Sequence, residues 1–424
     1  MDGRINKSNK LLEELMLEKI NDYIDSGTSI FNPQAKVIAN IENVIQFLET
    51  KNTSPVLVEV DPSNACNHGC YFCISSYIHL PESKDLETFD RSIMPKNILM
   101  SMCEDLVDLG VKAVNWTGGG EPTLNPNLKY AIQYMGKNNI PMGMFTNGAL
   151  LDRFDLFDTL VDNMTWVRFS VDAGTEKTYN WIRRPGKGQD WNKMHQNLAK
   201  LIDTNNAAGK KIDIGVGMVI TPDTYSEIVD YANTFKDFDL DYCQFKPEIV
   251  NREREEGVQR DVEFWNEKVE PLLDEAKDIL GDKFQLNGYK ITDLGEDPKI
   301  LGRHYKKCLG SQIQPCVGAD GHVYVCPNQR GYKQYSYGSL HEKTFKEIWN
   351  DLQARQEVMH QIDNVECFKF CTQLCKPHES NKMFWYLHEE HDKLKTNEEK
   401  QMFKDILFDA KEKVSGFIKH KEFI

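Results

Sequence analysis

Short β-rich runs alternate with helical periods from residue 55 to residue 246. The β-rich runs cover residues 55–61, 113–117, 141–148, 166–172, 212–221 and 240–246, and the helical periods cover residues 96–109, 126–139, 153–163, 191–208 and 224–236. Regular alternation with largely apolar strands indicates an α/β fold in which helices cover a parallel sheet. Six such units are too few to close an eight-fold barrel, so we expect an open or partial barrel.

The segments that flank this repeating part differ from it. Helical patterns at residues 10–25 and 36–50 predict a helical N-terminal extension over residues 1–54, ahead of a barrel over residues 55–250. Residues 251–304 are charged and predict a helical connector. The Asp320-Gly321 pair predicts a hairpin turn at residues 318–326, inside a small cysteine-rich α+β domain over residues 305–380. Residues 381–424 predict a C-terminal helical tail.

The composition excludes several classes of function. The chain has 51 Lys and Arg residues against 65 Asp and Glu residues, a formal net charge of −14. Because sequence-independent nucleic-acid affinity comes from Lys and Arg, this acidic surplus argues against broad nucleic-acid binding. The sequence has neither an apolar run of about 18 residues nor a secretory signal, so we expect a cytoplasmic protein with no membrane partner.

Nine of the eleven cysteines fall into three groups. The groups are Cys66, Cys70 and Cys73; Cys308, Cys316 and Cys326; and Cys367, Cys371 and Cys375, whereas Cys103 and Cys243 stand alone. Disulfides are rare in a reducing cytoplasm, so grouped cysteines there indicate metal or redox sites.

The first group reads Cys66-Asn-His-Gly-Cys70-Tyr-Phe-Cys73 and directly follows the first β-rich run. Cubane iron–sulfur clusters normally take four cysteines, so three thiolates with no nearby fourth leave one iron able to bind another molecule. A zinc site is the alternative. It needs four ligands, and His68 could supply the fourth only with awkward local geometry.

This Cys-x3-Cys-x2-Cys loop, with Phe72 before its last cysteine, resembles the signature of the radical S-adenosylmethionine superfamily. The resemblance implies a partial (β/α)6 TIM-like barrel and a [4Fe–4S] cluster on Cys66, Cys70 and Cys73 that chelates S-adenosylmethionine. It also implies one-electron cleavage of that cofactor to a 5′-deoxyadenosyl radical, which abstracts a hydrogen atom from the substrate. A flavodoxin or ferredoxin would supply the electron.

A glycine-rich segment, Thr-Gly-Gly-Gly-Glu-Pro-Thr at residues 117–123, follows the second β-rich run, where the family has a Gly-Gly-Glu-Pro segment contacting the methionine amino group. Glycine lets the backbone approach a ligand, and a carboxylate accepts from an ammonium group. The family uses polar strand ends and an arginine for the cofactor's carboxylate, and small apolar residues for its adenine. Turn formation, solvated charge and core packing remain the alternatives for each residue. The resemblance implies cofactor contacts from Gly118, Gly119, Gly120, Glu121, Pro122, Thr146, Asn147, Ser170, Asp172, Arg183, Arg184 and Val216.

The six C-terminal cysteines resemble the family's auxiliary-cluster module, called twitch in its short form and SPASM in its long form. Six cysteines suffice for one auxiliary [4Fe–4S] cluster but not for two fully ligated ones. The preferred ligands are Cys308, Cys326, Cys367 and either Cys371 or Cys375, and Cys316 is a substitute. The spacing departs from the long-form pattern, and a zinc module is the alternative.

The substrate is less constrained than the cofactors. Cys243 could donate a hydrogen atom to a substrate radical, although free cysteines usually pack as small hydrophobes. Lys246 and Glu248 could be acid–base groups or solvated charges. Peptide-modifying relatives often begin with a leader-binding domain, and only about 55 largely helical residues precede the barrel, less than a typical small domain. The sequence therefore favours oxidation, deoxygenation or epimerisation of a polar small molecule such as a sugar, aminoglycoside or nucleotide. Peptide or protein modification is the alternative, and a non-catalytic iron–sulfur protein is a more remote one.

Overall fold

The computed structural model describes residues 18, 20, 32–75, 91–186, 188–248, 262–286, 305–362 and 375–424. The helix predicted over residues 10–25 therefore lies almost entirely outside the described residues. No helix in the described ranges is both long and apolar enough to cross a membrane.

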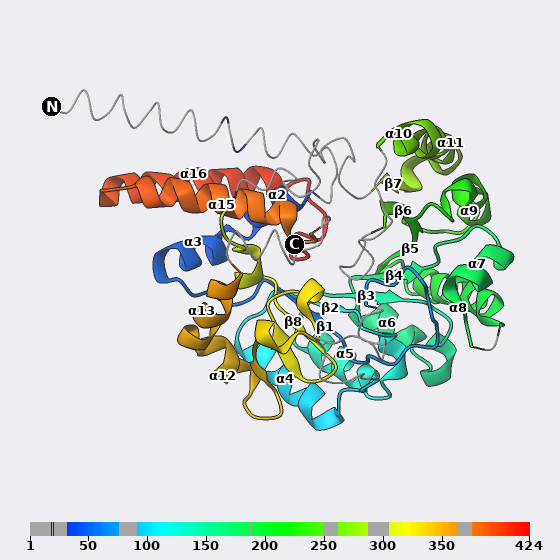
Figure 1. Ribbon diagram of the computed structural model, residues 1–424, viewed down its shortest axis with the longest axis horizontal. Helices are drawn as coiled ribbons and strands as arrows, with labels where there is room; N and C mark the ends of the chain where they lie inside the picture. Colours follow the sequence, from blue (N-terminus) through cyan, green and yellow to red (C-terminus); the bar gives the residue numbers. More distant parts are fainter. Residues whose placement is uncertain are drawn as a thin grey trace.

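Within the described ranges, all ten strands belong to one sheet, in the order β10-β9-β8-β1-β2-β3-β4-β5-β6-β7. Strands β1 to β7 pair in parallel in sequence order, which confirms the predicted partial barrel (Figure 1). The strands are β1 (Leu57–Val60), β2 (Ala113–Trp116), β3 (Met142–Thr146), β4 (Trp166–Ser170), β5 (Asp213–Ile220), β6 (Tyr242–Pro247), β7 (Phe284–Leu286), β8 (Cys316–Val317), β9 (His322–Tyr324) and β10 (Ser336–Ser339).

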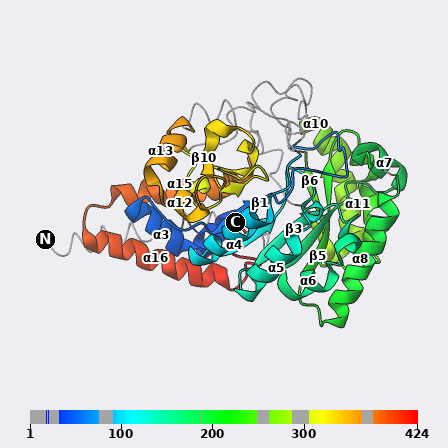
Figure 2. The same ribbon diagram turned by 90° about the horizontal axis from the view of Figure 1, so that it is seen from below.

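Helices cover the outer face of the barrel and form two further groups at its β1 edge (Figures 1 and 2). The barrel helices are α4 (Lys96–Asp108), α5 (Leu128–Lys137), α6 (Phe157–Asn163), α7 (Glu176–Arg183), α8 (Asp190–Ala207), α9 (Ile228–Phe235), α10 (Val262–Phe264) and α11 (Glu270–Leu280). The remaining helices are α2 (Pro33–Ala39), α3 (Ile41–Thr50), α12 (Phe345–Asn350), α13 (Leu352–Gln361), α15 (His378–Lys393) and α16 (Asn397–Ser415). The sequence did not predict α7 or β7.

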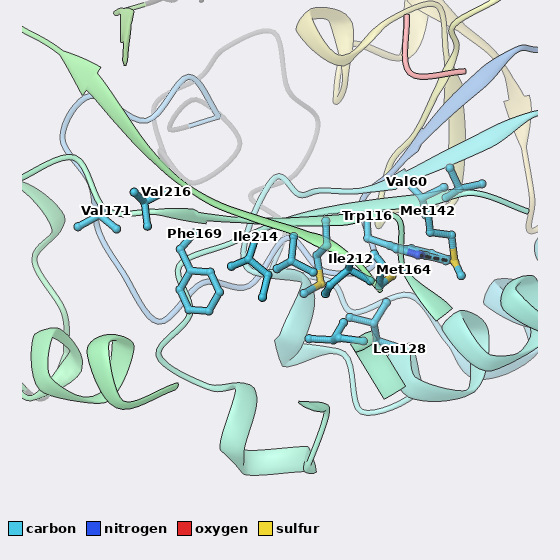
Figure 3. Packing of buried hydrophobic residues seen from close by; sticks show 14 of the residues in the cluster. Val60, Trp116, Leu128, Met142, Met164, Phe169, Val171, Ile212, Ile214 and Val216 are labelled. Carbon is cyan, nitrogen blue, oxygen red and sulfur yellow. Dashed lines mark hydrogen bonds between the residues drawn. The ribbon is translucent and has the colours of Figure 1, made fainter. Parts of the chain in front are cut away.

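The two faces of the barrel strands differ in polarity, because side chains alternate along a strand. The outward-facing residues of β1 to β6 pack with the helices in one hydrophobic cluster, part of which Figure 3 shows. Several inward-facing positions carry polar side chains instead, among them Glu59, Asn115, Arg168 and Gln244. The strands are therefore less uniformly apolar than the sequence pattern suggested.

The predicted C-terminal hairpin is present and extends the barrel sheet. Gly321 has a φ of 79° in the turn between β8 and the antiparallel β9. Strand β8 also pairs in parallel with β1, which places Cys316 opposite Glu59. The domain limits suggested by the sequence remain predictions, but the cysteine-rich segment and the barrel share one continuous sheet.

A second hydrophobic core joins α2 and α3 to α15 and α16 (Figure 1). The predicted helical stretch at residues 36–50 is two helices that meet at Asn40. The Asn40 amide donates to the carbonyl oxygens of Lys36 and Lys421, at 2.9 and 2.7 Å. A capping box between Thr396 and Glu399 starts α16.

The segment after α16 closes the end of the barrel where the strands begin. Phe423 is buried in a small cluster with Leu57, Ala113 and Trp166, and its ring centroid lies 5.6 Å from that of Trp166. His420 lies 2.9 Å from the Asp213 carboxylate at the start of β5. Residues of the predicted C-terminal tail thus fill the base of the barrel.

We predict that Phe423→Ala lowers the free energy of unfolding by about 3 kcal/mol, because it removes a buried aromatic side chain. Phe417, which is 47% exposed, provides a matched control, and Phe417→Ala should change stability by less than about 0.5 kcal/mol. Chemical denaturation followed by circular dichroism measures both. Equal effects of the two substitutions would contradict the assignment of Phe423 to the base of the barrel.

Candidate functional site

The first cysteine group lies on the loop after β1, at the end of the barrel where the parallel strands finish. The Cys66, Cys70 and Cys73 side chains are partly exposed and free of disulfides. Burial raises the pKa of the Cys70 thiol to about 12, and the neighbouring Cys73 charge adds to this shift. Burial also raises the pKa of Cys66, with further contributions from Glu121 and the other two thiols. In the part of the chain that the structure describes, no three His, Cys, Asp or Glu side chains are close enough together to hold a metal ion, so a shared centre on these three thiols stays a prediction.

The glycine-rich segment after β2 packs directly against this loop. The backbone N–H of Gly120 donates to the Ser63 carbonyl at 3.0 Å, and that of Glu121 donates to the Ala65 carbonyl at 2.8 Å. A Cβ at Gly120 would lie only 2.1 Å from the Ala65 carbonyl oxygen. Only glycine therefore permits this approach between the two predicted motifs.

The Glu121 carboxylate is buried and already holds internal hydrogen bonds. Its Oε1 accepts from the Thr123 hydroxyl at 2.7 Å and the Thr146 hydroxyl at 2.6 Å, and its Oε2 accepts from the Asn147 N–H at 2.8 Å. The structure therefore uses Glu121 and Thr146 to tie the end of β2 to the end of β3. Their predicted contacts with the cofactor remain predictions.

Asn67 and His68 connect the cysteine loop to α7 and α8. Asn67 accepts from the Asn147 amide at 2.7 Å and donates to Asp190 of α8 at 2.9 Å. His68 lies 3.0 Å from Asp190 through Nε2 and 3.3 Å from Arg183 through Nδ1. Because a guanidinium only donates, Nδ1 must accept and Nε2 must carry the proton that Asp190 accepts. Burial lowers the pKa of His68, which favours this neutral ring.

Arg183 of α7 also has internal partners. Its guanidinium donates to the Val171 carbonyl at 3.1 Å and forms a buried ion pair with Asp172. The other oxygen of Asp172 accepts from the Val219 N–H at 2.8 Å. The structure thus links β4, β5, α7 and the cysteine loop through residues that the sequence assigned to the cofactor.

The remaining predicted cofactor residues lie in different settings. Ser170 ends β4 opposite Gly217 and is partly exposed, whereas Arg184 is exposed, and its guanidinium carbon lies 5.8 Å from the centroid of the Tyr71 ring. Gly118, Gly119 and Pro122 belong to the segment that packs on the cysteine loop. Val216 points away from the barrel interior, into the hydrophobic layer beside Val171 (Figure 3). An adenine contact from the Val216 side chain does not fit this orientation.

Cys243 also faces outward. It is fully buried in the hydrophobic cluster between sheet and helices, and it pairs with Val216 on β5. A charge on its thiolate would raise the pKa of Tyr231 on α9. The thiol therefore does not lie on the inward face, and the packing role that the sequence offered as the alternative to hydrogen donation fits its position.

A small pocket in the C-terminal part brings together three of the predicted auxiliary ligands. Cys308, Cys326 and Cys375 line it. Cys367 and Cys371 lie outside the described residues. Cys316 does not line this pocket; it is buried on β8, where the charges of Asp61 and Cys326 raise its pKa further, beyond the larger effect of burial.

Arg330, four residues after Cys326, reaches the first cysteine loop. Its guanidinium lies 3.1 Å from the Asp61 carboxylate, before that loop, and 3.4 Å from the Ser75 hydroxyl, after it. All three residues are buried. Sequence reasoning missed Arg330, Asp61 and Asp190, because each is a single polar residue whose partner is distant in the sequence.

Comparison with known proteins agrees with this geometry. Residues 60–235 match the radical SAM superfamily, and residues 308–376 match SPASM, an iron–sulfur cluster-binding domain. The mycofactocin maturase MftC of Mycobacterium tuberculosis is 21% identical over 325 residues, which cover 75% of this chain and 76% of that protein. The chain therefore belongs to the radical SAM superfamily, and it is a radical SAM enzyme with a C-terminal SPASM domain.

Two solved structures share this fold. The first, Streptococcus suis SuiB bound to the precursor peptide SuiA, has a TM-score of 0.54 and 16% identity and covers 79% of this chain and 74% of its own. The second, anSMEcpe with bound AdoMet and the Kp18Cys peptide, has a TM-score of 0.52 and 19% identity and covers 85% of this chain and 99% of its own. Membership of the family implies a [4Fe–4S] cluster and S-adenosylmethionine, and the SPASM domain implies auxiliary iron–sulfur clusters, which favours iron–sulfur over zinc at both cysteine sites.

We predict that Gly120→Ala displaces the cysteine loop, because the new Cβ cannot fit beside the Ala65 carbonyl. Formation of 5′-deoxyadenosine should fall by at least about tenfold, as expected for a misplaced reacting group. Gly186→Ala is the matched control, because a Cβ there meets no atom within 4 Å. Iron and sulfide content after anaerobic reconstitution, measured beside activity, reports whether the cluster still assembles. Activity of Gly120→Ala equal to that of the control would contradict the close approach.

We predict that Arg330→Met destabilises the enzyme more at pH 8 than at pH 6. Burial raises the pKa of Asp61 to about 6 even with Arg330 present, so losing the cation should raise it further. The pKa of Asp61 in the unfolded chain is lower than in either folded protein. Between pH 6 and pH 8 the unfolded variant is ionised at Asp61, whereas the folded variant stays largely protonated there. Rising pH therefore lowers the free energy of unfolding of the variant but changes that of the wild type little. Thermal unfolding at the two pH values measures the difference. The double variant Arg330→Met/Asp61→Asn should remove the pH dependence, and an equal loss at both pH values would contradict the prediction.

Proposed function

We propose that this enzyme modifies a peptide or protein substrate by radical chemistry, rather than the polar small molecule that the sequence favoured. The observation that carries the catalytic part is the packing of the glycine-rich segment onto the cysteine loop, with Gly120 against Ala65. The substrate class is supported by SuiB and anSMEcpe, both captured with peptides and similar in fold over most of this chain. The name of MftC, a maturase, points the same way.

The chain carries candidate ligands for the implied cofactors. Cys66, Cys70 and Cys73 would hold the first cluster, and Cys308, Cys326 and Cys375 would contribute to an auxiliary one, with Cys367 and Cys371 as further candidates. When bound, the first cluster and S-adenosylmethionine supply the one-electron chemistry that removes a hydrogen atom from the substrate. We also propose a flavodoxin or ferredoxin as the electron donor and a cytoplasmic location.

The chain's own side chains orient these groups. Glu121 fixes the glycine-rich segment against the end of β3 through Thr146 and Asn147. His68, in its neutral form, holds the cysteine loop to Asp190 and Arg183. The Ser170 hydroxyl and the backbone of Gly118 are partly exposed groups that would bind the cofactor's polar end.

The test follows the hydrogen atom that the substrate loses to 5′-deoxyadenosine. Source cells are grown in deuterated medium, and their heat-treated extract is divided into peptide and small-molecule fractions, each incubated with the reduced holoenzyme and S-adenosylmethionine. We expect deuterium in 5′-deoxyadenosine, read by mass spectrometry, from the peptide fraction, and its loss after protease treatment of that fraction. A Cys70→Ala variant should transfer none. Transfer only from protease-resistant small molecules would overturn the proposal.

A further inference from the structure

The inward face of β4 to β6 carries two cationic side chains, Arg168 and Lys246. Arg168 lies across β5 beside Gly217, where a Cβ would lie 3.4 Å from Cδ and Nε of Arg168, in van der Waals contact. The guanidinium thereby reaches Gln244 on β6, to which it donates a hydrogen bond. Lys246 occupies the next inward position after Gln244 on the same strand.

Neither cation has a carboxylate partner among the described residues. Within the described ranges the Arg168 guanidinium donates to Gln244 and lies over the Phe145 ring, whose centroid is 4.1 Å from the guanidinium carbon, and its Nε is buried without a hydrogen-bond acceptor. Lys246 forms no ion pair with a described residue. Burial lowers the pKa of Lys246 to about 7, and the nearby Arg168 charge adds to this shift.

Three carboxylates on the inward side of the described strands are already paired. Asp172 pairs with Arg183, Glu59 with Lys376, and Asp213 with Lys419 and His420. Buried charges are normally paired, because their desolvation is otherwise costly. Asp172, whose charge acts on both Arg168 and Lys246, is thus already paired with Arg183. Two basic side chains without an ion pair in the described part of the chain, beside a buried N–H without an acceptor, form a site suited to an anion.

We propose that Arg168, Gln244 and Lys246 bind a carboxylate of the substrate. This inference rests on the proposed function and adds that the peptide presents an acidic group inside the barrel. A guanidinium binds a carboxylate through two parallel hydrogen bonds, and Lys246 adds a third donor. Arg168 lies two residues before Ser170, so it sits deeper than the strand end, where the cofactor residues gather.

Two sources of the carboxylate are open, an acidic side chain and a peptide C-terminus, and two probes separate them. N-acetylglutamate α-amide carries only a side-chain carboxylate, and N-acetylalanine carries only a terminal one. Neutral N-acetylglutamine α-amide is the control for both. The readout is the rate at which an uncharged acetylating ester modifies Lys246 in the holoenzyme at pH 7.5, measured by peptide mass spectrometry.

We expect at least one carboxylate probe to protect Lys246. At a probe concentration about four times its Kd, mass action predicts modification that is about fivefold slower. The neutral probe should give no protection, and the surface residue Lys211, which pairs with Asp162, should react equally in every sample. The more effective of the two probes identifies the source of the carboxylate.

Two variants test the role of Arg168. Arg168→Gln should abolish protection of Lys246, whereas Arg153→Gln, at an exposed position, should leave it unchanged. Should Arg168→Gln fail to fold, calorimetric titration of the protective probe into wild type and Lys246→Met replaces it, with at least a tenfold weaker Kd expected for the variant.

Three results would overturn the proposal. These are equal modification rates with all three probes, protection that survives in Arg168→Gln, and protection by S-adenosylmethionine alone, which would assign the two cations to the cofactor. The labelling needs no turnover. Absence of protection by both carboxylate probes in the wild-type enzyme would therefore defeat this inference alone, whereas deuterium transfer only from small molecules would defeat the proposed function alone.

Discussion

The buried carboxylate of Glu121 is the interaction on which the candidate site depends. It accepts hydrogen bonds from Thr123, Thr146 and Asn147, so it ties the segment after β2 to the end of β3. The same segment places Gly120 against the backbone of Ala65, and Asn147 continues the network to Asn67 in the cysteine loop. A buried acceptor that loses its donors costs free energy, so these segments are fixed together. Glu121 therefore acts as a scaffold for the site, whatever further contact it makes with a cofactor.

The fold was predictable where the hydrophobic pattern was long and regular. All six predicted barrel strands are present, and the helices between them match the predicted periods to within a few residues at most boundaries. Helix α7 was missed because its sequence, Glu-Lys-Thr-Tyr-Asn-Trp-Ile-Arg, is short and mostly polar. Strand β7 has three residues inside a charged helical segment, and its place in the sheet comes from pairing with β6, a tertiary contact that no local pattern reports.

The site was predictable where its residues are close together in the sequence. The cysteine loop and the glycine-rich segment are contiguous motifs, whereas the contact of Arg330 with Asp61 and that of Asp190 with His68 join single residues across the fold. The orientation of Cys243 was available from the sequence. In Tyr-Cys-Gln-Phe-Lys at residues 242–246, Cys243 and Phe245 share the apolar face of the strand, so Cys243 belongs to the packed side. Arg168, in an apolar run of its own strand, could not be assigned a partner without knowing that Gly217 lies beside it.

The charge of the interior opposes that of the whole chain. The formal net charge is −14, yet Arg168 and Lys246, two inward-facing side chains without a carboxylate ion pair among the described residues, are both basic. An acidic substrate would gain little from long-range attraction to such a surface, because exposed charges are screened over about 8–10 Å. Its carboxylate would instead be selected after entry, because the lower polarity of the barrel interior strengthens its interaction with the Arg168 guanidinium. A neutral analogue would leave that guanidinium without an anion. Selection would then depend on the path of Arg168 across β5 beside Gly217, where a methyl group would already be in van der Waals contact with Arg168 and a bulkier side chain would crowd it.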